Sequence, residues 1–314
     1  MPSKARIIKA KTGKADTGKA KTQPIYGAEV ERFHTRLLRV SLALEESRAY
    51  WEQREATVQC PDQCPDQCPD QHPDQRQNSQ GKQAERAFEA RWFGSKSLER
   101  VRRLLADFSH RYDAYPASLN VLSGWRPSDP TTRQNICHWH LQLADPMYRA
   151  FSGDFLEQRR SQLTTCTATI DRDIAARWVR QNLEAEWATA TILRMATALI
   201  TCATAAGLCE NTGGARVLTY PKVTDAALTY WLYFLKDLRF EGTLLSNPYF
   251  DSVGLGEGFL EPRLRQLSAL KFSRMGELHE LSWQYANIER WAEGELGIAV
   301  PISVPISVPT EAMT

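Results

Sequence analysis

The stretch ATATILRMATALITCATAAGLCENTGGARVLTY, residues 188–220, holds a long helical pattern followed by a turn and two short extended runs. One helical stripe is polar and contains Thr191, Arg194, Thr197, Thr201 and Thr204, while small and apolar side chains fill the rest. Gly207 suits a helix C-cap, and NTGG is a turn signal between runs 208–210 and 216–220. The stretch therefore predicts a mostly buried helix over 188–206 and then a β-hairpin.

A further helix is expected just before this stretch, from about Thr169 to residue 183. Asp171 and Asp173 would lie in its first turn, where negative charge suits the helix dipole. Its buried side would be lined by Ile170, Ile174 and Trp178. Two helices followed by a hairpin are the order of a winged helix-turn-helix, a DNA-binding motif, although the same order occurs without any DNA function.

Residues 188–207 are also about as long as a membrane span. Arg194 interrupts them near the middle, where a charge costs about 3 kcal/mol in a bilayer. Threonine contributes little to insertion, so we expect a soluble helix and no membrane partner. The N-terminus has no apolar stretch after its basic residues, and the seven cysteines show no disulfide pattern. We therefore expect a cytoplasmic protein.

Helical patterns also cover most of the first half of the chain. An apolar stripe predicts one long amphipathic helix over 28–54 and contains Phe33, Leu37, Val40 and Leu44. A second apolar stripe predicts a helix within SLERVRRLLADFSHRYDAYP, residues 97–116. Asp145 followed by Pro146 is a helix start signal, because aspartate caps and proline suits the first helical position.

The C-terminal part mixes the two periodicities. Thr224 is expected to cap a helix, and residues 246–262, SNPYFDSVGLGEGFLEP, read as a loop. A strand pair is predicted around ALKFS, residues 269–273, and ELHELSW, residues 277–283, before a last helix. The proline-interrupted tail PISVPISVP is expected to be extended.

Charge is distributed unevenly. The net charge is +2, but residues 4–21 hold seven of the 39 basic and one of the 37 acidic side chains, which leaves 32 − 36 = −4 for the remainder. The basic residues of this tract are Lys4, Arg6, Lys9, Lys11, Lys14, Lys19 and Lys21. A tract with so few large apolar side chains predicts a disordered basic tail over 1–22. Two interpretations stay open, electrostatic attachment to nucleic acid and a solubilising tail.

The repeat CPDQCPDQCPDQHPDQ, residues 60–75, presents three cysteines and one histidine, which is a zinc ligand inventory. Every gap is three residues and a proline follows each ligand, so consecutive ligands would spread along an extended chain. The Asp and Gln of the unit are also repeated, which metal binding does not require. We favour a low-complexity spacer, within an insertion at 56–82, over a zinc site.

Catalytic signatures are absent from the sequence. It contains no phosphate-binding G-x-x-x-x-G-K-[ST], no dinucleotide G-x-G-x-x-G, no G-x-S-x-G and no H-E-x-x-H. Cys137, His138 and His140 cluster in ICHWHL, but a helix would turn His138 away from the other two. We interpret them as buried side chains, and we expect a protein that is not an enzyme and uses no cofactor or metal.

Several segments, taken in order, resemble the BrxA family, a helical component of bacterial BREX phage-defence systems. They are FHTRLLRVSLALEESRAYW (33–51), RWFGSKSLERVRRLLADFSHRYDAYP (91–116), LADPMYRAFSGDFL (143–156), AAGLC (205–209) and RVLTYPKV (216–223). The longer members of the family continue into a segment like LTYWLYFLKDLRFEGTLLSNPYF, residues 228–250. The resemblance covers about residues 30–295, with the CPDQ repeat as an insertion.

The resemblance implies a non-enzymatic protein that binds nucleic acid beside a methyltransferase, an ATPase and a phosphatase-like partner. It points to the helix with Lys96, Arg100 and Arg103 and to the winged-helix region, where the basic residues are Arg177, Arg180 and Arg194. The basic tail and the repeat depart from the family pattern. So does the threonine-rich face of helix 188–206, which is poor in the Lys and Arg expected for major-groove readout.

We therefore expect a mainly α fold, a helical bundle with a winged-helix-like segment and a small C-terminal α+β subdomain. The expected divisions are a tail at 1–22, a helical domain at 23–160, the winged-helix-like region at 161–222, a C-terminal subdomain at 223–298 and a tail at 299–314. The expected function is binding of double-stranded DNA, or alternatively RNA, as an accessory component of a BREX-type system. The alternative is an interaction scaffold that does not touch DNA.

Overall fold

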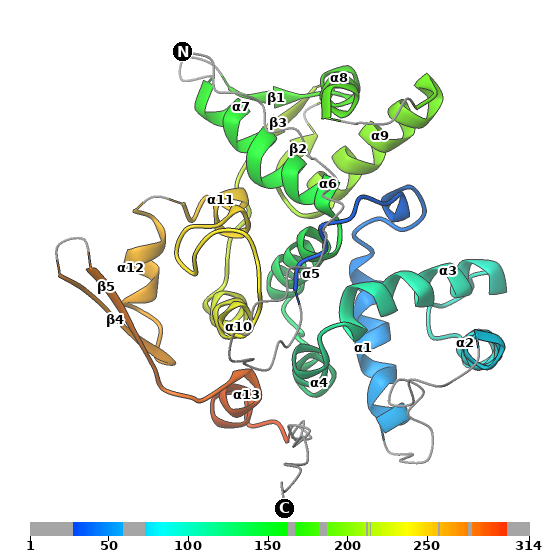
Figure 1. The fold of residues 1–314 in the computed structure, drawn as a ribbon, viewed down its shortest axis with the longest axis horizontal. Helices are drawn as coiled ribbons and strands as arrows, with labels where there is room; N and C mark the ends of the chain where they lie inside the picture. Colours follow the sequence, from blue (N-terminus) through cyan, green and yellow to red (C-terminus); the bar gives the residue numbers. More distant parts are fainter. Residues whose placement is uncertain are drawn as a thin grey trace, which may run out of the picture.

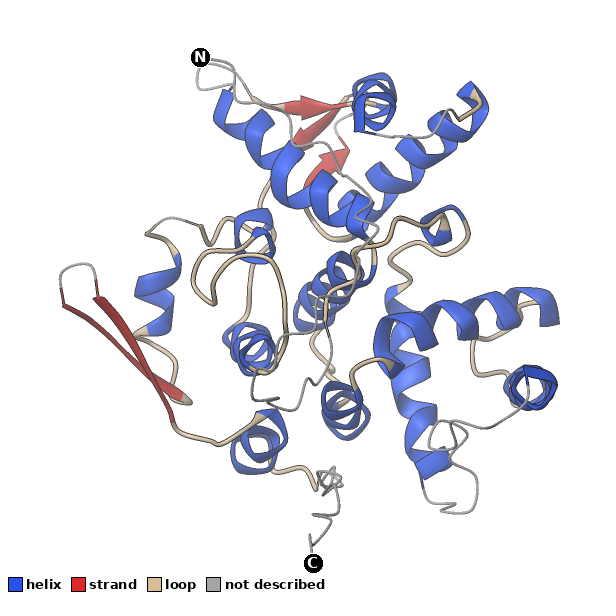
Figure 2. Ribbon diagram, viewed as in Figure 1, coloured by secondary structure: helices blue, strands red, loops and turns tan. Residues whose placement is uncertain are grey.

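A computed structural model describes residues 28–58, 73–162, 167–182, 187–211, 213, 215–256, 258–275 and 278–299. Most of this structure is helical, and its strands form two small antiparallel sheets (Figure 2). The predicted mainly α fold with a small α+β part is confirmed. The basic tail, the CPDQ repeat up to residue 72 and the segment 301–309 lie outside the described residues.

The centre of the molecule is helix α5 (Pro130–Ala144), which is buried from Asn135 to its end. Asp129 caps it by accepting a hydrogen bond from the Thr132 amide at 2.8 Å. Helix α10 (Asp225–Lys236) packs against it, and α13 (Ile288–Leu296) packs in turn on α10 and on α4 (Pro116–Trp125) (Figure 1). Trp139 of α5 stacks on Trp231 of α10 with ring centroids 5.3 Å apart. Aromatic packing therefore joins the two halves of the chain.

The N-terminal helices pack on one side of this centre. They are α1 (Leu44–Val58), α2 (Pro73–Glu89), α3 (Leu98–Phe108) and a π-helical turn η3 (Ser109–Asp113). The helix predicted within 97–116 is confirmed, and Ser97 caps it through the Arg100 amide at 3.3 Å. Helix α2 begins inside the range 56–82 that was expected as an insertion.

The prediction of one long helix over 28–54 is wrong for its first half. Residues 28–43, which we call the strap, run across the molecule with only a single 3-10 turn, η1 (Arg36–Leu38), before α1 begins at Leu44. Val40 and Leu42 are both buried although they are two residues apart, which is the alternation of an extended chain and not of a helix. Ala43 then adopts a left-handed φ of 50°, which ends the strap.

The region expected to resemble a winged helix, residues 161–222, contains helices α8 (Arg172–Asn182) and α9 (Thr189–Ala205) and strands β1 (Thr169–Ile170), β2 (Cys209–Asn211) and β3 (Arg216–Leu218). Helix α7 (Leu156–Gln162) comes directly before β1 and begins ahead of this region. The strands form an antiparallel sheet in the order β1-β3-β2. Helix, strand, two helices and a two-stranded wing is the connectivity of a winged helix-turn-helix. Gly207 has a φ of +75°, as a C-cap glycine does.

The start predicted for α8, at about Thr169, is three residues early, because α8 begins at Arg172. Thr169 lies in β1, where it pairs with Val217, because the wing strand β3 offers it a partner that local sequence does not reveal. Asp171 therefore lies just before α8 and accepts a hydrogen bond from the Ile174 amide at 2.8 Å. It acts as a capping residue and is not in the first turn.

After Thr224, which caps α10 as predicted through the Ala227 amide at 3.2 Å, the chain forms more helix than expected. Short helices α11 (Pro248–Ser252) and α12 (Leu260–Leu264) lie in the segment predicted as loop. The dipeptide Asn247-Pro248 is the missed signal, since Asn247 caps α11 and proline occupies its first turn. The predicted strand pair is confirmed as β4 (Leu270–Met275) and β5 (Leu278–Trp283).

Two short helical segments connect α5 to α7. They are α6 (Pro146–Arg149) and the π-helical η4 (Ala150–Phe155). Asp145 caps α6 by accepting from the Tyr148 amide at 2.9 Å, which confirms the predicted Asp-Pro start.

Candidate nucleic-acid interface

A groove of about 440 Å³ lies where α9, the strap and α3 meet. In Figure 1 the blue strap passes beside α9, with α3 on its other side. The residues that line the groove are Leu37, Leu38, Arg39, Ser41, Arg100, Arg172, Leu193, Arg194, Thr197, Ala198 and Thr201. Four are arginines, each from a different element, and none of these described lining residues is acidic. A hollow with this charge is a candidate site for an anion.

Helix α9 supplies one wall through its polar stripe. Its opposite side is buried in the core, through residues that include Ile192, Met195, Leu199 and Ile200. Arg194, Thr197 and Thr201 are exposed toward the groove. The Thr197 hydroxyl donates to the Leu193 carbonyl at 2.9 Å, and that of Thr201 donates to Thr197 at 2.8 Å. Because their protons are used within the helix, these hydroxyls can only accept hydrogen bonds from a ligand.

The strap supplies the other wall, and a buried arginine holds it in place. Arg111 of η3 is 1% exposed and donates to the carbonyls of Leu42 at 3.1 Å and Ser41 at 2.7 Å. A third donation, at 3.3 Å, reaches Val40. Its charge is balanced by Asp107, whose carboxylate lies 2.6 Å away. Arg111 therefore fixes the backbone that carries Arg39 and Ser41 into the groove.

The groove arginines keep most of their charge for a ligand. Arg100 donates to the backbone carbonyl of Arg39, which ties α3 to the strap, and its charge also acts on Glu46, whose carboxylate pairs with Lys96. Arg172 lies 3.8 Å from Asp173, but both side chains are more than half exposed, so solvent screens this pair. Arg194 forms no hydrogen bond or ion pair with the described residues. Like charges gathered in one hollow favour a ligand with several negative charges.

Of the predicted basic residues that the structure describes, Arg100 and Arg194 are the two that it brings together. Lys96 instead pairs with Glu46 at 3.0 Å, and Arg103 pairs with Glu99 of its own helix at 2.9 Å. Both lie outside the groove lining.

Other predicted residues are placed elsewhere. Arg177 and Arg180 are exposed on α8 but do not line the groove. The basic residues from Lys4 to Lys21 are not among the described residues. Sequence reasoning missed Arg39 and Arg172. Arg39 falls within the predicted helix 28–54, whereas it lies on the strap, and Arg172 is the first residue of α8, whose start was predicted at about Thr169.

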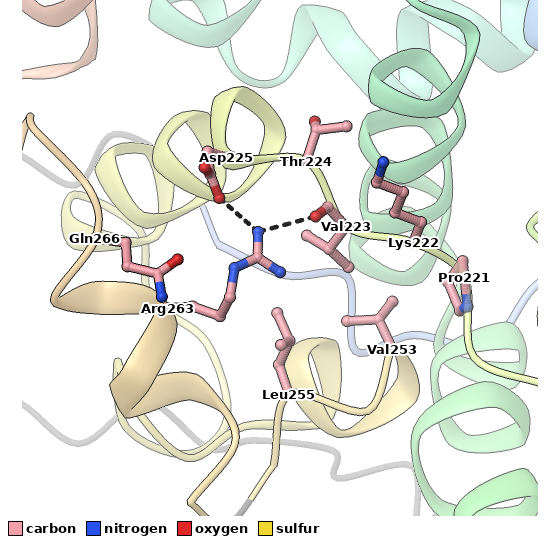
Figure 3. Close-up of a pocket in the computed structure, with 9 residues that line it drawn as sticks. All are labelled: Pro221, Lys222, Val223, Thr224, Asp225, Val253, Leu255, Arg263 and Gln266. Carbon is pink, nitrogen blue, oxygen red and sulfur yellow. Dashed lines mark hydrogen bonds and ion pairs between the residues drawn. The ribbon is translucent and has the colours of Figure 1, made fainter.

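A second hollow, of about 570 Å³, lies between α10, α12 and the loop after α11 (Figure 3). Its central cation is Arg263, which donates to the Val223 carbonyl at 2.9 Å and to Asp225 at 2.6 Å. Figure 3 shows its guanidinium directed at these two partners. Because the charge is already balanced by Asp225, this contact serves to hold α12 against the start of α10. The smaller groove is the better candidate for binding.

The cluster Cys137, His138 and His140 is buried in α5, as interpreted from the sequence. His138 lies 2.9 Å from the Tyr148 hydroxyl, and His140 lies 2.7 Å from that of Tyr230. Burial lowers the pKa of both imidazoles to about 3. Within the described parts of the chain, no three His, Cys, Asp or Glu side chains are placed to share a metal ion.

These buried histidines predict a loss of stability in mild acid. Their pKa in the folded protein lies below the unfolded value near 6.5, so the unfolded chain binds protons that the folded chain does not. Stability is therefore present above about pH 6.5, and each histidine lowers the unfolding free energy by about 1.4 kcal/mol per pH unit once pH falls below about 6. Urea unfolding between about pH 7 and 5 should show this decline.

The matched variant is His138→Gln. Whatever its absolute stability, its pH slope should be shallower than that of the unmodified chain by about 1.4 kcal/mol per unit near pH 5. Equal slopes would show that His138 is protonated in the folded protein.

The fold and groove together define a mainly α protein with winged-helix connectivity and a basic groove against the second helix of that motif. The chain has no significant match to a protein-family model, to a curated protein or to a solved structure. In the described part of the chain, every helix is too short or too polar to span a membrane.

Proposed function

We propose that the protein binds nucleic acid, in particular double-stranded DNA, through the groove beside α9. The observation that carries the proposal is the convergence of Arg39, Arg100, Arg172 and Arg194 without an acidic lining residue. Guanidinium groups bind phosphate strongly because their donors match two oxygens at once. Each neutralised phosphate releases counterions, and this entropy gain drives binding.

The biological setting is proposed on the sequence resemblance to BrxA. In that setting the protein acts without catalysis as an accessory component of a BREX-type phage-resistance system. Its partners are DNA, with RNA as the alternative, and a methyltransferase, an ATPase and a phosphatase-like protein. A methyltransferase gene and a large ATPase gene beside its own would support this assignment, and their absence would oppose it.

Fluorescence anisotropy with a labelled duplex tests the binding directly. If about 6 phosphates are neutralised, including those that meet the basic tail, the log-log slope of affinity against salt is about −5. Affinity then falls about a thousandfold between about 50 and 200 mM salt. Deleting residues 1–22 should make the slope shallower while binding persists. No binding by the full chain at about 50 mM salt would contradict the proposal.

The second candidate function is an interaction scaffold, and one observation favours it. Phe259 and Met275 are 72% and 73% exposed, far more than most large apolar side chains of the described structure. Met275 ends strand β4 of the hairpin at the edge of the molecule (Figure 1). Partner subunits that still co-purify after nuclease treatment, and are lost in Phe259→Ser/Met275→Ser, would support the scaffold.

A further inference from the structure

We infer that the groove grips the sugar-phosphate backbone and that α9 positions the protein on nucleic acid without reading its base sequence. This inference rests on the proposed function and specifies what the same groove recognises. It concerns the role of α9, which in a winged helix-turn-helix is the helix that enters the major groove.

The strap limits the access of α9 to a DNA major groove. A helix with its side chains is about 10–12 Å across and so fills a major groove about 12 Å wide. One flank of α9 is taken by η1 of the strap, which packs on the helix, and Leu193 and Ala198 of α9 are half-buried. A major groove cannot admit α9 and this neighbouring segment together. The exposed stripe of α9 therefore faces a hollow of the protein itself, which one backbone can enter.

The groove-facing side chains of α9 are poorly suited to reading base edges. Base edges are read mainly by Arg, Asn, Gln, Lys or carboxylate side chains with free donors or acceptors. Of these, the groove-facing stripe of α9 offers only Arg194, because Thr197 and Thr201 have committed their protons to the helix. The other three guanidiniums come from the strap, α3 and α8. Cations spread over separate elements suit successive or shared phosphates, which position a protein but carry no sequence information.

The groove has two walls, and each wall carries arginine side chains. Arg100 lies on the wall formed by α3 and the strap, whereas Arg194 lies on the α9 wall. The carbonyl of Arg39 accepts from Arg100, so the backbone of this wall holds the Arg100 guanidinium in place. A phosphate between the walls would contact both, and each arginine would strengthen the hold of the other.

A double-mutant cycle with Arg100→Gln and Arg194→Gln tests this arrangement on a labelled duplex of about 20 base pairs. Each single variant should bind about 5- to 10-fold more weakly and lower the salt slope by less than about 0.9, because the remaining arginine still contacts the shared phosphate. The double variant should lose at least about threefold less affinity than the product of the single losses, because the two side chains share a phosphate. Lys271→Gln, an exposed change on β4, is the matched control and should leave binding unchanged.

The same proteins are then titrated with duplexes of shuffled sequence and equal length. Affinities should agree within about threefold, since each base pair read through a good contact would change affinity by about fivefold or more. Losses that multiply independently, or a strong dependence on sequence, would overturn the inference while leaving DNA binding intact. Absence of binding by the unmodified chain would instead overturn the proposed function. Unfolding midpoints of all variants are measured first to confirm folding.

Discussion

We expect Arg111→Met to lower the free energy of unfolding by about 3–5 kcal/mol. The substitution leaves Asp107, which is 4% exposed, as a buried carboxylate without its cation. It also leaves the carbonyls of Val40, Ser41 and Leu42 without their shared donor. Urea denaturation at neutral pH measures the change. The strap should loosen as well, so hydrogen exchange of its amides should accelerate.

Two matched variants make this result specific. Arg103→Met removes an exposed arginine from the neighbouring helix and should change stability by no more than about 0.5 kcal/mol. Arg111→Met/Asp107→Leu removes the whole pair and should recover part of the loss, because a buried ion pair can be replaced by apolar groups at little cost. A loss below about 1 kcal/mol for Arg111→Met alone would show that the strap is held by other contacts.

The second large effect is expected for Trp231→Ala, with a loss of about 3–5 kcal/mol. Trp231 is fully buried and stacks on Trp139 at an interplanar angle of 19°. It also meets the rings of Phe234 and Tyr249 with centroids 5.2 and 5.4 Å away. Removing the indole opens a cavity at the contact between α5 and α10, which rigid neighbours cannot refill.

Phe259→Ala provides the comparison for this aromatic position. Its ring is 72% exposed, so the substitution should change the unfolding free energy by no more than about 0.5 kcal/mol. If Trp231→Ala were equally mild, the two halves of the chain would not share one core. Chemical denaturation of both variants, followed with the same probe, measures the two changes in unfolding free energy.

Helices with a local cap and a clear apolar stripe could be predicted from the sequence. Asp145-Pro146 before α6 and Thr224 before α10 both act as expected. Such signals lie within a few residues of the structure they specify. A mainly α fold could therefore be predicted without knowledge of tertiary contacts.

The strap and strand β1 could not be predicted, because distant partners decide them. The pattern of Leu37, Val40 and Leu44 fits a helix equally well, and the extended path is fixed by tertiary hydrogen bonds from Arg111, Arg100 and Arg149. Strand β1 has two residues and exists because β3 pairs with it. Local propensity is weak compared with such tertiary contacts.

The groove shows the same limit for function. Arg100 and Arg194 could be selected as exposed cations on predicted helices, but nothing in the sequence indicated that they share a hollow. Arg39 and Arg172 became candidates only when the strap and the start of α8 were placed. Lys96 and Arg103 carry the same charge in the sequence, but in the structure they form ion pairs with Glu46 and Glu99.

The most direct test of the central claim compares the salt dependence of DNA binding in two proteins. One is the unmodified chain, and the other carries Arg39→Gln, Arg100→Gln, Arg172→Gln and Arg194→Gln together. If the groove holds the phosphate backbone, the log-log slope becomes shallower by about 2 to 3, since Arg100 and Arg194 share one phosphate and each phosphate lost from the groove removes about 0.9. A slope and affinity equal to those of the unmodified chain, in a variant that remains folded, would show that nucleic acid does not bind in the groove.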